Sequence, residues 1–449
     1  MGKFRSPWLW LPIVVLAACR SEEGRGLRTA MTYPETPRGE ISDAYFGTTV
    51  ADPYRWLEQT DSPSTDAWID AQNAISEPFL EAIPARQRYI DRLTKLWNHE
   101  RFGLPVVRGG RYFWTRNDGL QNQAVLYVAD RLDGAARVLL DPNGLSNDGT
   151  KALASWVPSL DGRHLAFGIS DGGSDWNEWR VLVVATGEQL PDRIGRMKFS
   201  GVSWDASGQG FFYSRYPLGA EGRGNDRLPV TIHHHTLGRP QDEDPLVCDL
   251  KHPTRNPYGA VTDDGRYLIV TLFDGYETNA VHYQDLATPG AEVVPLLDAW
   301  DARYGFLGNV GSRFYFETTL GAPRKRIVEI DVNGDRSPKE VVPQSEHVLE
   351  GASLVGDRLI ATYLEHARSS VRIFGLDGSL ERDLALPGIG SATGFGGRVD
   401  AKETFYAFTS YTSPGAIYHY DLESGSTQLF RAPKAVSYTH LTLPTSDLV

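Results

Sequence analysis

Apolar and polar positions follow one another along most of this chain in a recurring unit. The unit is clearest at residues 260–290, where the polar turn Asp263-Asp264-Gly265 leads into an apolar segment at residues 267–271. A second apolar segment follows at residues 280–283. One such unit cannot bury its own apolar face, but several units stacked around an axis can. The pattern therefore predicts strands that pack on equivalent strands from other parts of the chain.

The recurring units keep a nearly constant period. Their first apolar strands lie 45 to 56 residues apart, marked by Tyr112, His164, Phe211, Tyr267, Phe314, Leu359 and Phe405. Each unit has two clear strands, punctuated by Asp-Gly or Asn-Gly turns, and room for two more. Seven four-stranded units predict a seven-bladed β-propeller over residues 104–432. A pair of β-sandwiches is the alternative, but sandwiches do not keep a constant period over so long a stretch.

Residues 33–103 precede the repeats and show helical spacing. One segment begins near Ser64 or Thr65, either of which could cap it, and a second covers residues 85–97, with Pro78 and Pro84 bracketing the join. Both place apolar side chains three or four residues apart, as amphipathic helices do. Two such helices make too small a core for a domain. We therefore expect this helical segment to pack on something else.

The amino-terminal residues resemble a targeting signal. An apolar run at residues 8–18 follows Lys3 and Arg5, and it is too short to span a bilayer. It ends in Leu-Ala-Ala-Cys at residues 16–19, which resembles the lipobox of bacterial lipoproteins. We expect a signal peptide at residues 1–19, lipidation of Cys19 and a tether at residues 20–32. An ordinary secretory signal is the alternative, while myristoylation at Gly2 is disfavoured by the apolar run that follows.

Composition excludes several classes of function. The 449 residues carry a formal net charge of −12 without a stripe of Lys and Arg, which argues against a nucleic-acid partner. Two cysteines cannot form a disulfide framework. With Cys19 lipidated, Cys248 has no partner, and we expect it to be a small core residue.

The repeats contain few residue patterns that suggest catalysis or metal binding. His233, His234 and His235 follow one another in a predicted strand, so their side chains alternate between faces and cannot converge on one metal ion. Residues 168–172 match the pattern G-x-S-x-G, but a nucleophile elbow needs a following helix, and Ser170 lies between two strands. We interpret Ser170 as a turn residue. We expect no catalytic residue, no metal ligand and no cofactor site in this chain.

Several short segments lie in order along residues 33–431. They are DPYRWLE at residues 52–58, AQN at 71–73, GLQNQ at 119–123, LDPN at 140–143, GSDW at 173–176 and FTSY at 408–411. Together these segments resemble the prolyl oligopeptidase family. The resemblance implies a seven-bladed propeller over an α/β-hydrolase domain, to which the helical segment at 33–103 belongs. It also implies that no strand is shared between the first and last blades.

The same resemblance implies a function. Members of the family use a Ser/Asp/His triad to cut short peptides on the carboxyl side of proline, and the propeller restricts entry to peptides. Val181 and Cys248 fall near positions that help to line the family's substrate pocket. A monomer is expected. With the lipobox, the resemblance predicts an exported enzyme in the periplasm or anchored to the outer membrane.

The sequence also departs from the family pattern. The triad should follow the last blade, where the sequence ends, and residues 433–449 have no counterpart in the family. Residues 436–445 resemble a translated adapter from a transposase-based sequencing library. We therefore expect a truncated prolyl oligopeptidase that is inactive by itself. Two other interpretations stay open, a stand-alone propeller that acts as a binding scaffold and a fragment of a related serine oligopeptidase specific for basic residues.

Overall fold

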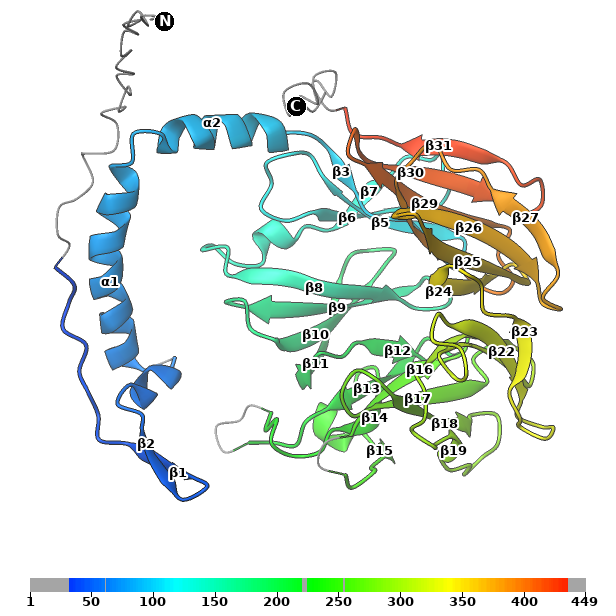
Figure 1. The fold of residues 1–449 in the computed structure, drawn as a ribbon, viewed down its shortest axis with the longest axis horizontal. Helices are drawn as coiled ribbons and strands as arrows, with labels where there is room; N and C mark the ends of the chain where they lie inside the picture. The colour runs from blue at the N-terminus through cyan, green and yellow to red at the C-terminus, as the bar shows by residue number, and fades with distance from the viewer. Residues whose placement is uncertain (1–31, 61, 220–223, 253–254, 435–449) are drawn as a thin grey trace, which may run out of the picture. The chain divides into compact units, whose positions relative to one another are not determined.

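The computed structural model describes residues 32–60, 62–219, 224–252 and 255–434. The chain divides into two compact units, Met1–Leu93 and Thr94–Val449, and each is described by itself. Figure 1 shows the elements in chain order. The predicted signal peptide with Cys19, nearly all of the predicted tether and residues 435–449 lie outside the described residues.

The first unit contains a hairpin and helices. Its elements are β1 (Ser42–Tyr45), β2 (Thr48–Ala51), the 3-10 turn η2 (Arg55–Glu58), α1 (Pro63–Glu81) and the start of α2 (Arg86–Trp97). The two predicted helices are confirmed, with corrected details at the first. Its cap is Ser62, not Ser64 or Thr65, because Ser62 Oγ accepts the Thr65 backbone N–H at 3.2 Å. Pro63 suits the first helical position, since proline has no backbone N–H that would need a partner there. Pro78 lies inside α1 rather than at its end.

The second unit is built from seven antiparallel sheets, here called blades 1 to 7. Blade 1 holds β3 (Arg101–Phe102), β4 (Val106–Arg108), β5 (Arg111–Asn117), β6 (Val125–Ala129) and β7 (Arg137–Leu140). Blade 2, after η3 (Pro142–Gly144), holds β8 (Lys151–Pro158), β9 (His164–Asp171), β10 (Trp176–Val183) and β11 (Gln189–Lys198). Blade 3 holds β12 (Val202–Trp204), β13 (Gly210–Arg215), β14 (Thr231–Thr236), η4 (Gln241–Glu243) and β15 (Leu246–Cys248). Blade 4 holds β16 (Asn256–Val261), β17 (Tyr267–Phe273), β18 (Asn279–Asp285) and β19 (Val294–Leu297).

The remaining three blades repeat the same plan. Blade 5 holds β20 (Tyr304–Val310), β21 (Arg313–Thr318), β22 (Arg326–Asp331) and β23 (Lys339–Val342). Blade 6 holds β24 (Val348–Val355), β25 (Arg358–Glu365), β26 (Arg368–Gly375) and β27 (Leu380–Leu384). Blade 7 holds β28 (Ser391–Gly396), β29 (Glu403–Ser410), β30 (Ser413–Asp421) and β31 (Thr427–Arg431). The predicted seven-bladed propeller is therefore confirmed, and among the described strands none is shared between the first and last blades.

Tight turns with glycine join neighbouring strands. In the Asp377-Gly378 turn, Gly378 has φ +83°, and a Cβ atom there would lie 1.9 Å from the Val341 carbonyl oxygen. Only glycine fits this position without moving the backbone of the neighbouring blade. The Asp-Gly signal in the sequence thus marks the points where one blade closes against the next.

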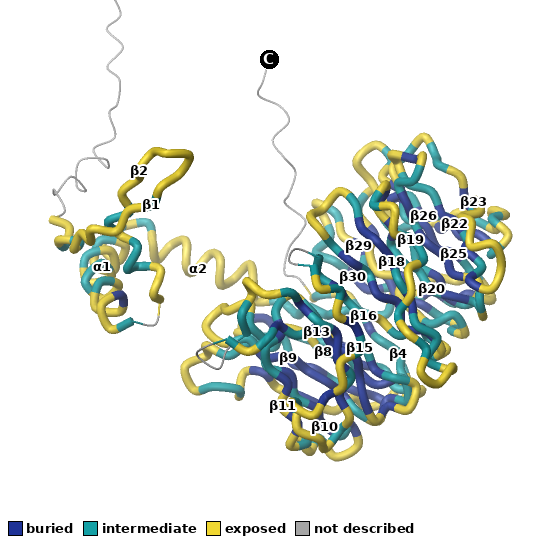
Figure 2. Tube along the Cα trace, turned by 90° about the horizontal axis from the view of Figure 1, so that it is seen from below, coloured by how far each residue is buried: buried dark blue, intermediate teal, exposed yellow. Residues whose placement is uncertain are grey.

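The core lies between blades rather than at one centre. One cluster joins Tyr267 and Tyr283 of blade 4 to Phe314 and Phe316 of blade 5, and similar clusters join the other blades that are consecutive in the chain. Figure 2 shows the buried segments along the strands and the exposed ones at their ends. Apolar area removed from water at each contact holds the blades together.

Side chains close the ring between blades 1 and 7. Tyr112 Oη donates to Glu403 Oε1 at 2.5 Å, and the other carboxylate oxygen of Glu403 accepts from His419 Nε2 at 2.5 Å. The Tyr112 ring also meets the Phe405 ring edge-on, with centroids 6.3 Å apart. Burial and the hydrogen bond to Glu403 raise the pKa of Tyr112, so the phenol stays protonated and keeps donating.

Candidate functional site: the mouth of the propeller tunnel

The first strands of the blades surround a central tunnel. Residues from the first strands or first turns of blades 1, 2, 3, 4 and 7 line one cavity of about 930 Å³, which can happen only if those strands face the axis of the ring. Most exposed residues on the first strands are small, including Ala154 and Ser155 on β8, Ala260 on β16 and Thr393 on β28, while β24 exposes Val348 and Glu350. The small side chains leave space along the axis of the ring.

The cavity opens on what we call the turn face, where first and second strands of each blade are joined. Its charged lining residues are Arg108, Asp161, Asp263, Asp264, Arg398, Asp400, Lys402, Glu403 and Asp421. The Asp264 carboxylate accepts from Thr262 Oγ1 and Asn309 Nδ2 at 2.6 and 2.8 Å, so it is held by its own surroundings. A cavity of this size accommodates a few residues of an extended peptide and no folded domain.

Arg108 extends its guanidinium into this charged setting. Its Nη1 donates to the Val107 carbonyl at 2.8 Å, and no carboxylate of the described residues lies within 4.0 Å of it. Burial lowers the pKa of Arg108, while nearby Asp263 acts in the opposite direction. Arg108 nevertheless keeps its charge at neutral pH, since an arginine pKa starts far above that range.

One contact crosses the mouth. Blades 4 and 7 lie on opposite sides of the ring, yet the Val399 backbone N–H donates to Asp263 Oδ2 at 3.3 Å. Arg398 Nη1 lies 4.0 Å from the other oxygen of the same carboxylate. The turn between β28 and β29 therefore extends over the axis of the ring and forms one wall of the cavity.

The opposite face, here called the linker face, carries the loops between second and third strands and the links between blades. Seven large apolar side chains are exposed in its loops: Leu120, Phe199, Leu218, Leu228, Tyr276, Ile389 and Tyr411. At the other end of the blades, the exposed large apolar side chains among the described residues are those at the starts of fourth strands, Val138, Leu246, Val294 and Leu380. Loops that expose as many large apolar side chains as those of the linker face are typical of a surface that another domain covers.

Both chain connections of the propeller also lie on the linker face. β3 is antiparallel to β5, which runs from the turn face, so β3 begins at the linker face. β31 is antiparallel to β30 and ends at Arg431 on the same side. Any segment that precedes Arg101 or follows Arg431 is thus attached to the apolar side of the ring.

Comparisons with known proteins identify the family of this chain. The family model described as "Prolyl oligopeptidase, N-terminal beta-propeller domain" matches residues 34–433. The chain belongs to the prolyl oligopeptidase family. A prolyl endopeptidase of Elizabethkingia meningoseptica is 35% identical over 409 residues, which are 90% of this chain and 57% of that protein. Prolyl oligopeptidase ophP of Omphalotus olearius is 32% identical over 89% of this chain and 59% of its own length.

Solved structures agree with the sequence relatives. One from a study of two prolyl endopeptidases and their inter-domain dynamics has a TM-score of 0.83 and 33% identity, over 90% of this chain and 60% of that one. Prolyl oligopeptidase B of Galerina marginata, bound to a 35mer substrate, has a TM-score of 0.80 and 25% identity. The chain spans less than two thirds of the length of these relatives.

The two pocket residues suggested by the prolyl oligopeptidase resemblance occupy different settings. Val181 is 1% exposed on β10 and packs with Trp179 and Phe211 between blades 2 and 3. Cys248 is 7% exposed at the end of β15 and lines a cavity of about 460 Å³ beside His282. Burial raises the pKa of the Cys248 thiol to about 11, so it stays protonated and unreactive at neutral pH. A role for either residue in a substrate pocket stays a prediction.

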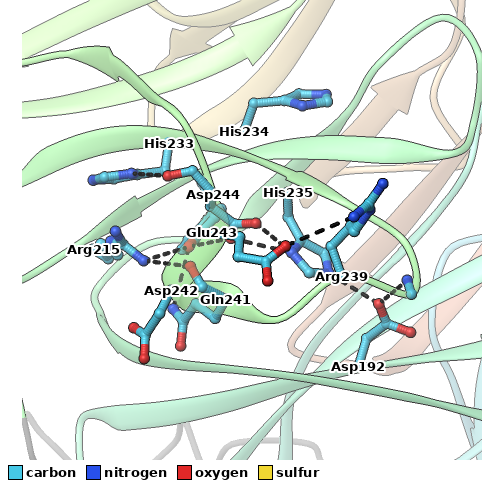
Figure 3. A network of polar contacts seen from close by, with 12 residues as sticks. Asp192, Arg215, His233, His234, His235, Arg239, Gln241, Asp242, Glu243 and Asp244 are labelled. Carbon is cyan, nitrogen blue, oxygen red and sulfur yellow. Dashed lines mark hydrogen bonds and ion pairs between the residues drawn. The ribbon is translucent and has the colours of Figure 1, made fainter.

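The consecutive histidines alternate between faces of β14, as predicted. His234 Nε2 contacts Asp205 Oδ2 at 2.9 Å on one face, while His233 and His235 lie on the other near Asp244 (Figure 3). Within the described ranges, no three His, Cys, Asp or Glu side chains gather closely enough to hold a metal ion. His233 and His235 thus share one network with Asp244, while His234 forms a separate pair with Asp205.

His235 is the centre of that network, which sequence reasoning missed. Its ring is fully buried, and its Nδ1 and Nε2 donate to Asp244 Oδ1 and Asp192 Oδ1, both at 2.9 Å (Figure 3). Two hydrogen bonds to two carboxylates require a doubly protonated imidazolium. Burial opposes that charge, but the contacts with Asp244 and Asp192 outweigh burial and raise the pKa of His235.

Ser170 does not occupy a turn, which corrects the sequence interpretation. It lies in β9, paired with Asn177 of β10 and Ala152 of β8, and the hairpin turn comes only after Asp171. In the described part of the chain, no serine hydroxyl is hydrogen-bonded to a histidine ring nitrogen.

Among the described residues, no helix is long and apolar enough to cross a membrane.

Proposed function

We propose that this chain is the access-controlling part of a serine-type oligopeptidase that cleaves short peptides after proline. The proposal rests on the difference between the two faces of the ring. One face opens into a tunnel lined by small residues, and the other is apolar and carries both chain connections. In a family whose relatives are prolyl endopeptidases, such a ring fits a cover over a neighbouring hydrolase domain.

The helical unit supports the same proposal. Along α2, Tyr89, Leu93 and Trp97 are exposed and recur at helical spacing, so they form one apolar row. A row of this kind loses contact with water only when another surface covers it. A hydrolase domain that packs on α2 would supply this surface.

In the proposed enzyme, the chemistry is acyl transfer. A serine attacks the carbonyl carbon of the prolyl residue, a histidine takes up the serine proton, and backbone N–H groups stabilise the oxyanion. None of these groups is assigned to the residues described above. The part played by this chain is to admit extended peptides through a narrow passage, to exclude folded proteins, and to keep bulk water from the reacting bond.

We expect the purified 449-residue chain to hydrolyse no chromogenic prolyl peptide above the buffer rate. The reason is that the described residues contain no serine–histidine pair that could generate a nucleophile. Release of the chromophore over time measures this, with a related prolyl endopeptidase as the positive control. Turnover that follows the protein through purification and disappears with a serine-reactive phosphonate would contradict the proposal.

Sequencing the genomic locus directly tests the proposed hydrolase domain. Codons that follow the one for Ala435 are expected to encode a G-x-S-x-G elbow, then an aspartate and a histidine, as the family's chemistry requires. A stop codon immediately after the last blade would instead favour a stand-alone binding scaffold. The nature of the residues that line the pocket in the new segment would separate post-proline cleavage from cleavage after basic residues.

We also propose that Cys19 carries a lipid that anchors the protein to a bacterial membrane facing the periplasm. The apolar run at residues 8–18 and the Leu-Ala-Ala-Cys string support this. We expect Cys19→Ser to move the protein from the membrane fraction to the soluble fraction, as measured by immunoblotting of cell fractions. An unchanged membrane fraction would contradict lipidation. The released form is proposed to be a monomer, which light scattering after gel filtration would check.

A further inference from the structure

The carboxylates that line the turn-face cavity are already hydrogen-bonded within the chain. Each of the six accepts at least one hydrogen bond from a neighbouring backbone or side-chain group. They are Asp161, Asp263, Asp264, Asp400, Glu403 and Asp421. A cation that entered the cavity would have to compete with these donors.

Arg108 differs from the acidic residues because most of its hydrogen-bonding groups have no partner. A guanidinium carries five N–H donors. Among the described residues, Arg108 uses only Nη1, which donates to the Val107 carbonyl at 2.8 Å. The edge formed by Nε and Nη2 is therefore free. This edge of a guanidinium can bind both oxygens of one carboxylate at once.

The backbone around Arg108 is fixed by the neighbouring blade. Gly109 has φ +56°, and a Cβ atom there would lie 1.9 Å from the Asp161 carbonyl oxygen of blade 2. Arg111 Nη1 donates to the Gly162 carbonyl at 3.0 Å, which joins the same two turns. The first turn of blade 1 therefore cannot shift without moving the first turn of blade 2. The Arg108 side chain extends into the cavity lining from this fixed position.

The surroundings of Arg108 compensate its charge incompletely. Burial lowers the pKa of Arg108, Asp263 and Asp400 oppose that change, and Arg398 adds to the effect of burial by repulsion. Because the balance is a lowered pKa, the folded chain stabilises this charge less than water does. An anion beside Arg108 would supply the attraction that is missing.

We propose that Arg108 anchors a binding site for a carboxylate group in the turn-face cavity. The ligand presents a single carboxylate, either at the carboxyl terminus of a peptide or on a small organic acid. The guanidinium fork matches the two oxygens of a carboxylate. One negative charge also meets less repulsion from the six acidic side chains than the higher charge of a phosphate would. The inference goes beyond the proposed function, because such binding requires neither passage through the ring nor hydrolysis.

Saturation-transfer NMR with the full chain tests for the site. The probes are N-acetyl-trialanine with a free carboxyl terminus, the same peptide as its amide, and acetate, all at constant ionic strength. We expect the amide to bind about tenfold more weakly than the free acid, since the charge-assisted fork is lost. Acetate that displaces the peptide at similar concentration identifies a site for small acids, and tighter binding of the peptide identifies a site for peptide termini. Equal binding of acid and amide overturns the proposal.

Variants locate the binding site on the chain. Arg108→Gln should weaken binding of the free acid about tenfold, and Arg108→Lys, which keeps the charge without the fork, should weaken it less. Arg266→Gln is the matched control, because Arg266 belongs to the first turn of blade 4, lies outside the cavity lining and is paired with Asp285 at 3.1 Å. Its affinity should stay within twofold of the parent. The same result for Arg108→Gln, with the melting temperature retained, would show the inference to be wrong.

Chemical labelling of the unaltered chain gives an answer even if a variant fails to fold. Phenylglyoxal modifies accessible guanidinium groups, and mass spectrometry of the digested protein follows Arg108 and Arg266 in the same sample. At about ten times its dissociation constant, the free-acid peptide should slow modification of Arg108 about tenfold and leave Arg266 within twofold. The amide should protect neither residue. Equal slowing at both arginines would mean general screening, and it would overturn a site at Arg108.

Discussion

Replacing His235 with leucine is expected to lower the free energy of unfolding by about 3–5 kcal/mol, the usual cost of leaving a buried charge without its partner. Asp192 and Asp244 face His235 from two sides, and their side chains are 1% and 2% exposed. With leucine between them, two buried carboxylates would have no cation. Because Asp192 belongs to β11 and His235 to β14, the substitution also removes a contact between blade 2 and blade 3. Denaturant unfolding followed by tryptophan fluorescence measures the change.

The same network gives a pH dependence of defined sign. The pKa of His235 is raised in the folded protein above its ordinary value of about 6.5. A group with a raised folded pKa stabilises the protein fully below the unfolded value, and this contribution is lost as pH rises through the folded value. We therefore expect the difference in unfolding free energy between parent and His235→Leu to shrink above pH 6.5. A difference that grows with pH would contradict a charged His235.

His234→Leu is the matched control for both measurements. It changes the neighbouring residue in the same strand to the same side chain. His234 contacts a single carboxylate, Asp205, and the two side chains are 23% and 20% exposed. Solvent screens a pair of this kind, so we expect a loss of about 1 kcal/mol or less. Equal losses in the two variants would show that the doubly bonded imidazolium has no special role.

The propeller could be predicted from the sequence because its signals are local. The Asp-Gly turns and the apolar strands repeat at a steady interval, and each can be recognised without knowing what packs against it. The helical segment was predicted for the same reason. Its cap was misplaced by two or three residues because a serine at position 62, before Pro63, competes with two other hydroxyl residues that follow.

The side-chain contacts of the site depend on partners that no local pattern specifies. Asp192 lies 43 residues before His235, in a strand whose own alternation gives no reason for a buried carboxylate. Asp263 and Val399 are 136 residues apart, and only closure of the ring brings them together. The local sequence offers no signal for this partner, because Asp192 is flanked by Pro191 and Arg193 and does not interrupt an apolar run.

Replacing Phe314 with alanine is expected to lower the free energy of unfolding by about 3–5 kcal/mol, the range for removing a buried aromatic side chain. Phe314 is fully buried, and its ring lies 4.9 and 5.7 Å from those of Tyr267 and Tyr283 in the preceding blade. Since no strand crosses from the last blade to the first, such blade-to-blade contacts carry the stability of the ring. Tyr276→Ala is the control, because Tyr276 belongs to the same pair of blades but is 89% exposed, and its loss should stay within about 0.5 kcal/mol. Thermal and denaturant unfolding of both variants measure the difference, and similar losses would mean that the ring is held by contacts other than those between blades.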